Sequence, residues 1–306
     1  GTSAGDQQTT ADANTYMGYL AGYNTISGSE NVFIGRQAGY EFKNANSPYN
    51  VYVGSFAGYH NQTGRYNTYI GGQAGFGASG NSHSNNTGVG TNALNDVTTG
   101  GDNVAIGSFV AAKLTTGAHN VFIGKTAADD MVEGSYNIAI GSDALGGAKD
   151  STADSSQHNT FIGVNSGNGA WVTAVSQYNV AVGNYTLDGA MNGATSNVAV
   201  GYQALSAITT GDANVSLGSE AGESIDTGLY NVSIGYQSNE AITSGQYNIT
   251  IGAFALETAT TALKNIMIGG GAGQNITAGV AVNGAIGIGY GAFSGTGTQT
   301  TDINHT

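Results

Sequence analysis

A five-residue motif, Asn-Val-Xaa-Ile-Gly or a close variant, recurs along the chain and constrains its fold more than any other feature. Fifteen copies begin with Asn, a sixteenth has Ala285 in that place, and nine of the fifteen intervals between copies are 17 residues. A short and nearly constant period is typical of solenoids, in which each repeat forms one coil and packs on its neighbours. The sequence therefore predicts an all-β parallel β-solenoid.

The pattern within one repeat predicts the course of a coil, counted from the motif Asn as position zero. Positions one and three are apolar and mostly β-branched, which is the alternation of a short, half-buried strand. Position seven is Ala in twelve copies, which indicates a small inward-facing site. Turn residues such as Thr209-Thr210-Gly211 precede the next Asn. We expect a strand, a tight Gly turn, a second strand of small residues and a polar corner, repeated in a thin roll of about sixteen coils of 17–22 residues.

Position four is Gly in every copy. An unvarying Gly within a repeat marks a positive φ or a backbone approach too close for a Cβ. The turn glycines on which this prediction rests are Gly35, Gly107, Gly124, Gly141, Gly201, Gly218, Gly235 and Gly252.

The motif Asn is predicted to form a ladder. Stacked coils place the same side chain at the same corner, so each amide can bond to the next, and Asn tolerates the left-handed backbone that sharp corners require. The ladder residues predicted in this way are Asn31, Asn103, Asn120, Asn137, Asn197, Asn214, Asn231 and Asn248.

Composition excludes several classes of partner. The 306 residues include 20 acidic and 7 basic ones, for a net charge of −13, so no basic stripe is present to bind nucleic acid or an anionic membrane surface. No apolar run approaches the 18 residues of a membrane span, so no membrane insertion is expected. The absence of Cys excludes disulfides and thiolate metal sites.

Three segments are expected along the chain: a polar N-terminal segment at 1–13, the β-solenoid repeat domain at 14–293, and a polar C-terminal tail at 294–306. Terminal coils of a solenoid expose unpaired strand edges. Either flanking domains cover these edges, or the coils of another copy do so in a head-to-tail polymer.

Position two predicts self-association. It alternates between aromatic residues such as Phe33 and Tyr52 and small ones such as Ala105, and it points away from positions one and three. If these rings faced solvent, they would form an apolar ribbon, so we expect them to be buried against other copies, most simply in a homotrimer.

The motif also carries a resemblance. The copies at 103–107, 137–141, 179–183 and 197–201 resemble head repeats of trimeric autotransporter adhesins, and Gly201-Tyr202-Gln203-Ala204-Leu205 followed by Thr209-Thr210-Gly211 is similar to repeats of phage tail fibres found upstream of intramolecular chaperone domains. The resemblance covers residues 14–293 and implies a left-handed β-roll, side-by-side trimers, and an extracellular location on a cell surface or virion. The longer period and the missing chaperone domain depart from those families.

Candidate ligand contacts are few. Interruptions of the period are where loops can add recognition, and they contain the only tryptophan, Trp171, and Tyr49 beside the only proline. Exposed rings on a polar surface could stack on a host-surface glycan. No catalytic or metal-ligand constellation appears in the residue spacing, so no enzyme and no cofactor is expected, although carboxylates of three chains could hold an axial cation.

The leading interpretation is a structural extracellular fibre that projects, adheres or polymerises into a filament. The main alternative is a carbohydrate-binding or carbohydrate-cleaving tailspike with a site at chain boundaries or in the irregular loops. An ice-binding solenoid is weaker, because Thr stands at position one in only four coils.

Overall fold

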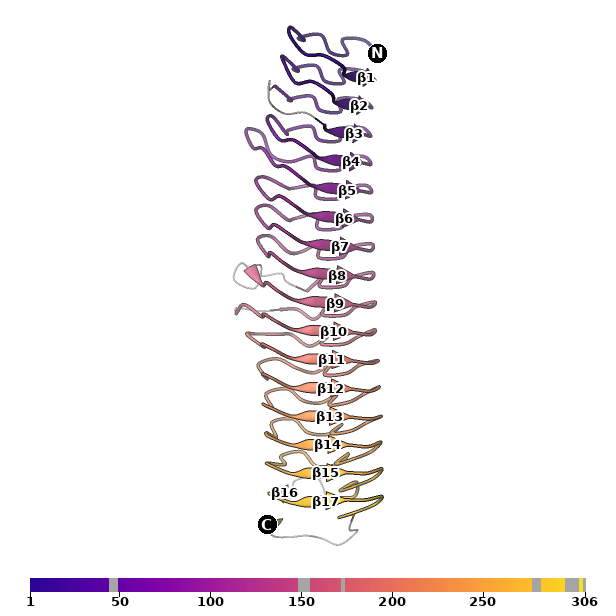
Figure 1. The fold of residues 1–306 in the computed structure, drawn as a ribbon, viewed down its shortest axis with the longest axis vertical. Coiled ribbons are helices and arrows are strands. Elements are labelled where there is room, and N and C mark those ends of the chain that lie inside the picture. The colour runs from indigo at the N-terminus through magenta and orange to yellow at the C-terminus, as the bar shows by residue number, and fades with distance from the viewer. Residues whose placement is uncertain (44–48, 148–154, 172–173, 277–281, 295–302, 305–306) are drawn as a thin grey trace. The chain divides into compact units, whose positions relative to one another are not determined.

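The computed structural model describes residues 1–43, 49–147, 155–171, 174–276, 282–294 and 303–304. Over these residues the chain is an all-β parallel β-solenoid without a helix, as the repeat predicts. It divides into two compact units, the first made of residues 1–146 and 154–156 and the second of residues 147–153 and 157–306. Each unit is a stack of coils, with one short strand in each motif (Figure 1).

Both units have the same strand order, in which each strand pairs in parallel with the next one along the chain. The first unit contains β1 (Thr15–Met17), β2 (Val32–Ile34), β3 (Val51–Val53), β4 (Thr68–Ile70), β5 (Thr87–Val89), β6 (Val104–Ile106), β7 (Val121–Ile123) and β8 (Ile138–Ile140). The second contains β9 (Thr160–Ile162), β10 (Val180–Val182), β11 (Val198–Val200), β12 (Val215–Leu217), β13 (Val232–Ile234), β14 (Ile249–Ile251), β15 (Ile266–Ile268) and β17 (Ile286–Ile288), besides the short pair β16 (Val282–Asn283) and β18 (Ile303–Asn304).

The register follows the motif, so that Val104 pairs with Val121, Ala105 with Phe122, and Ile106 with Ile123. Strands of only three residues suffice because every coil repeats the same pairing at a spacing of about 4.8 Å.

The second strand expected in each coil is not formed. After the motif, alternate residues have positive φ, as at Gly35 (134°), Gln37 (55°) and Gly39 (59°), and this backbone cannot be an extended strand. The backbone groups still bond between coils: Gln37 donates to Tyr19 O at 2.8 Å, and Gly39 donates to Ala57 O at 2.9 Å. The turn half of the coil therefore satisfies its polar groups without forming a ladder of strands.

The expectation that position two faces outward is wrong, because these residues form the core of each coil. Phe33, Tyr52, Phe122 and Ala105 are all fully buried. A coil of 17 residues encloses one narrow core, and the strand directs position two into it while positions one and three face outward. The rings that suggested trimer contacts are thus buried within their own chain.

Position eight compensates for the size of position two. A Cβ on Gly39 would lie 2.7 Å from the ring of Phe33, and where position two is Ala139 the residue at position eight is the buried Leu145. The pairing continues to Gly287 and Phe293. In most coils a large residue at one position goes with a small one at the other, and both are small at Ala105 and Ala111 and at Ser216 and Gly222.

Residues 1–13 form the turn half of a further coil, which extends the repeat beyond the boundary expected at residue 14. Ser3 and Gly5 have the positive φ of positions six and eight, and Gly5 donates its N–H to Ala21 O at 3.0 Å, as Gly39 does to its next coil. Within the tail expected at 294–306, β18 pairs in parallel with β16.

Candidate interaction surface

The motif asparagines form the predicted ladder inside each unit. Asn103 Oδ1 accepts the backbone N–H of Asn120 at 3.0 Å and its side-chain Nδ2–H at 3.0 Å, while Asn120 Nδ2 also donates to Gly134 O at 2.9 Å. All eight predicted ladder residues are fully buried, namely Asn31, Asn103, Asn120, Asn137, Asn197, Asn214, Asn231 and Asn248. These amides join coils and are not accessible to a ligand.

The position-four glycines lie directly on one another. A Cβ on Gly124, where φ is 138°, would come 2.2 Å from Gly141 O, and a Cβ on Gly201 would come 2.3 Å from Gly218 O. Both reasons predicted for an unvarying Gly are present, namely positive φ and close backbone approach. The predicted glycines of this column are Gly35, Gly107, Gly124, Gly141, Gly201, Gly218, Gly235 and Gly252, and each has φ between 128° and 146°.

The outer face of the strands is the main apolar surface of each unit. Positions one and three face outward, and their exposed members include Ile106 in the first unit and Leu217 and Ile251 in the second. None of the sixteen copies has a charged residue at these positions. Monomeric proteins rarely leave such a continuous apolar surface uncovered. We call these two columns of each unit the apolar sheet face.

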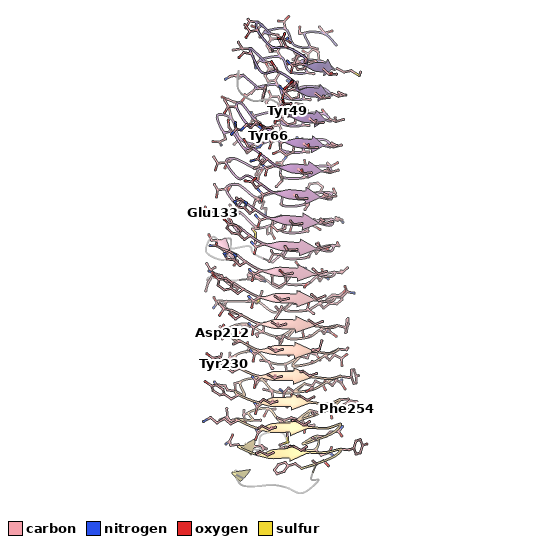
Figure 2. All side chains as sticks on the ribbon, viewed as in Figure 1. Tyr49, Tyr66, Glu133, Asp212, Tyr230 and Phe254 are labelled. Atoms are coloured by element: carbon pink, nitrogen blue, oxygen red, sulfur yellow. The ribbon has the colours of Figure 1, made fainter. Side chains whose placement is uncertain are left out.

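An aromatic column borders this face at the position immediately before the motif Asn, which we call the flanking column. Here Tyr49 stacks on Tyr66 with centroids 5.7 Å apart, and Tyr230 stacks on Tyr247 at 5.0 Å. Figure 2 shows Tyr49 and Tyr66 together at one edge of the first unit, and Tyr230 at an edge of the second. Each ring is about half exposed, because its face is covered by the neighbouring ring and its rim meets solvent.

Two histidines take part in the same column. The ring of His119 lies 4.9 Å from that of Tyr136, and His158 lies 5.2 Å from Tyr178, both pairs nearly parallel. Positive φ recurs at this position, for example at Tyr136 (60°) and Tyr178 (60°), so the backbone directs every member of the column in the same way.

The two predicted ligand contacts lie in different environments. Tyr49 is exposed over 54% of its surface, and a hydrogen bond to Glu30 raises the pKa of its phenol. Trp171 is fully buried and packs edge to face on Phe161, with centroids 5.6 Å apart. The expectation of an exposed ring at Trp171 is therefore wrong: the indole fills the core of a longer coil. Much of the neighbouring insertions, at 44–48, 148–154 and 172–173, lies outside the described residues.

A second set of stacked rings stands at position nine of the first coils, where Tyr23, Tyr40 and Tyr59 follow one another at 5.6 and 5.1 Å. In the second unit this position carries carboxylates in four coils, at Asp188, Glu223, Glu240 and Glu257. Burial and the neighbouring carboxylates, first that of Glu257, raise the pKa of Glu240. Among the described residues no group of three or more His, Cys, Asp or Glu side chains is arranged to hold a metal ion, and the axial cation remains a prediction.

Among the histidines that the structure describes, His83 is buried. His83 Nδ1 lies 2.8 Å from Tyr69 Oη, and the carbonyl oxygen of His83 accepts a bond from Asn67 Nδ2 at 2.8 Å. Burial lowers the pKa of His83 to about 3, so the ring is neutral near pH 7. This pair fills the end of a coil core and has no access to solvent.

Models of known protein families and the sequences of curated proteins give no match to this chain. In the described part of the chain, no helix has the length and apolar character needed to cross a membrane.

The sequence interpretation missed the surface that the strands expose. It placed the interface at position two, whereas the apolar sheet face is made of positions one and three. The size compensation between positions two and eight would have identified the core side, because only residues that share a core need to balance their volumes. The recurrence of Tyr or His before the motif Asn would have identified the flanking column.

Proposed function

We propose that the chain is a structural segment of an extracellular fibre, in which copies associate side by side through the apolar sheet face. The observation that carries this proposal is that positions one and three lie on the outside of the strands, carry no charged residue, and are apolar except for Thr at position one of four coils. An exposed surface of this kind is unfavourable in a monomer and is removed by association.

The size of the surface supports a stable interface. Eight coils at 4.8 Å, with a face three residues wide from position one to position three, give about 400 Å² per unit on each partner. Standard protein interfaces bury about 800 Å² per partner, so the apolar sheet face of one unit supplies about half of this area.

The assembly we propose is a homotrimer of left-handed rolls, as the resemblance to adhesin heads and tail-fibre repeats implies. It would stand on a cell surface or virion and project or adhere, and its terminal coils would allow head-to-tail growth. The proposal requires no catalytic group, because the coil supplies length, the Asn ladder supplies cohesion, and the outer surface supplies contacts.

The experiment compares two paired variants. Leu217→Lys with Ile251→Lys places charges on the apolar sheet face, whereas Thr210→Lys with Ser244→Lys adds the same charges on the exposed turns. The face variant is expected to sediment as a single folded chain while the turn variant keeps the mass of the unmodified assembly. Equal masses for both variants would reject the apolar sheet face as the interface.

A further inference from the structure

The flanking column of the second unit is interrupted by a notch. Tyr178 and Tyr230 occupy the same position of the coil, three coils apart, and the two coils between them carry Ser196 and Ala213 there. The small side chains leave the ring faces of the two tyrosines about 14 Å apart, as three coil spacings require.

Both rings are held from outside the notch. His158 stacks on Tyr178 with planes 8° apart, and Tyr247 stacks on Tyr230 with planes 13° apart. Each tyrosine therefore has one covered face and one face toward Ser196 or Ala213. Tyr178 is exposed over 56% of its surface and Tyr230 over 51%. Rings fixed in this way lose little conformational entropy when a ligand stacks on them.

Polar groups lie beside the notch. Ser196 is exposed, and Asp212, one residue before Ala213, accepts the backbone N–H of Thr195 at 2.6 Å and its hydroxyl at 3.0 Å through Oδ1. Figure 2 shows Asp212 and Tyr230 along the same edge of this unit. The carboxylate is thus fixed close to the small residues of the notch and has a second oxygen to accept hydrogen bonds from a ligand.

We propose that this notch binds a short neutral oligosaccharide. Sugar rings present flat C–H faces to aromatic rings and hydroxyls to carboxylates and serines, which are the groups present here. Contact distances of about 3.7 Å at each ring face leave about 7 Å between them, so a thick, non-planar ligand such as a saccharide fits the notch better than one planar aromatic molecule. The carboxylate of Asp212 and the net charge of −13 disfavour an anionic ligand.

The corresponding gap in the first unit is different. Between Tyr66 and His119 the column carries Asn85 and Asp102, and the guanidinium of Arg65 lies 5.6 Å over the ring of Tyr66. The arginine competes for the face on which a sugar would stack. This gap is the matched control, because it has the same position in the coil and Arg65 lies over the ring of Tyr66.

The test places a ring inside the notch. Ala213→Tyr adds a ring against the open face of Tyr230, at a residue whose φ, 55°, matches the 57° of Tyr230, so the variant is expected to fold. Asp102→Tyr makes the same change in the first unit. Binding of maltotriose, cellotriose and chitotriose is measured by titration calorimetry and saturation-transfer NMR on the whole chain.

We expect at least one trisaccharide to bind with a Kd of about 1 mM or lower, to lose binding in Ala213→Tyr, and to bind about tenfold more weakly to Tyr230→Ala. Asp102→Tyr is expected to bind as the unmodified chain does. No binding by any of the three sugars, or binding that survives Ala213→Tyr, would overturn the proposal.

Only the biological setting of this inference rests on the proposed fibre. The assembly mass of Ala213→Tyr, measured alongside, separates the two: an unchanged mass with lost sugar binding supports a glycan site. A changed mass would assign the notch to contacts between copies and overturn the glycan proposal. Loss of assembly in the face variants leaves the sugar titration as an independent result.

Discussion

Asn103 Oδ1 accepts two hydrogen bonds from Asn120, one from its backbone N–H and one from its side-chain amide, each 3.0 Å long. One buried oxygen thereby satisfies two donors of the next coil, while the second hydrogen of the Asn120 amide goes to a backbone carbonyl. Neither Asp nor Gln provides the same reach and donor set. The motif Asn is thus a structural joint between coils.

The ladder predicts a coupled loss of stability. Asn120→Ala leaves the backbone N–H of Asn137 without its acceptor, and should lower the free energy of unfolding by about 2–4 kcal/mol. The double variant Asn103→Ala/Asn120→Ala should lose less free energy of unfolding than the two single variants added together, because both changes remove the same shared bonds. Urea unfolding measures this free energy for the two single variants and the double variant, with the exposed Thr116→Ala as control. Strict additivity would contradict the ladder.

The glycine column predicts a contrast between two positions with similar φ. In Gly124→Ala the new methyl would lie 2.2 Å from Gly141 O, whereas a Cβ on Gly289 meets nothing within 4 Å among the described residues. Gly124→Ala and Gly289→Ala should each have backbone strain of about 1–2 kcal/mol. The free energy of unfolding of Gly124→Ala should fall by several kcal/mol more, or this variant should fail to fold. Melting temperatures compare them, and equal losses would show that φ alone fixes these glycines.

The core predicts a rescue. Phe33→Ala should cost about 3–5 kcal/mol by leaving a cavity. Gly39→Leu alone should also destabilise, since its side chain would collide with the Phe33 ring. The double variant restores the small–large pairing found at Ala139 and Leu145, where Leu adopts a φ of 55°, and should recover most of the loss. Urea midpoints of the four proteins test this, and a double variant less stable than either single one would refute the pairing.

Buried His83 predicts a pH dependence. Its pKa is about 3 in the folded chain and about 6.5 when unfolded, so the unfolded state binds a proton that the folded state does not. The contribution of His83 to stability is complete above about pH 6.5 and falls by about 1.4 kcal/mol per pH unit down to about pH 3. Between pH 7 and pH 4.5 the free energy of unfolding of the unmodified protein should therefore fall by about 2.7 kcal/mol more than that of His83→Gln. Parallel slopes of the two proteins in urea unfolding would contradict this burial.

Trp171 offers a spectroscopic prediction. Its indole is fully buried and its Nε1 has no hydrogen-bond partner among the described residues. The fluorescence emission of this single tryptophan should be blue-shifted and hardly quenched by iodide. Trp171→Phe should lower the free energy of unfolding by about 1 kcal/mol or less, because it removes an unpaired donor. Strong iodide quenching would place the ring at the surface.

The repeat made the fold predictable because a fixed period dictates register. Gly124 and Asn103 could be assigned from the sequence, since each needs its residue type for a reason repeated in every coil. The inward side of the strand could not be read from alternation, because Val104, Ala105 and Ile106 are all apolar. A period-two pattern locates two faces without saying which one is the core.

Other parts depended on geometry that a single repeat does not reveal. The exposed turns look like a second strand in the sequence, yet the positive φ at residues such as Gln37 prevents it. Trp171 was assigned to the surface because it lies in an irregular coil, whereas longer coils need larger core residues. The notch between Tyr178 and Tyr230 exists only because coils are stacked in register.

We propose that copies of this chain associate through the apolar sheet face. Sedimentation equilibrium of the unmodified protein, with electron microscopy of the same sample, tests it most directly. We predict particles with three times the chain mass of 30.7 kDa, or longer filaments built from them. A folded species that remains at the mass of one chain at the highest concentration reached would contradict the account.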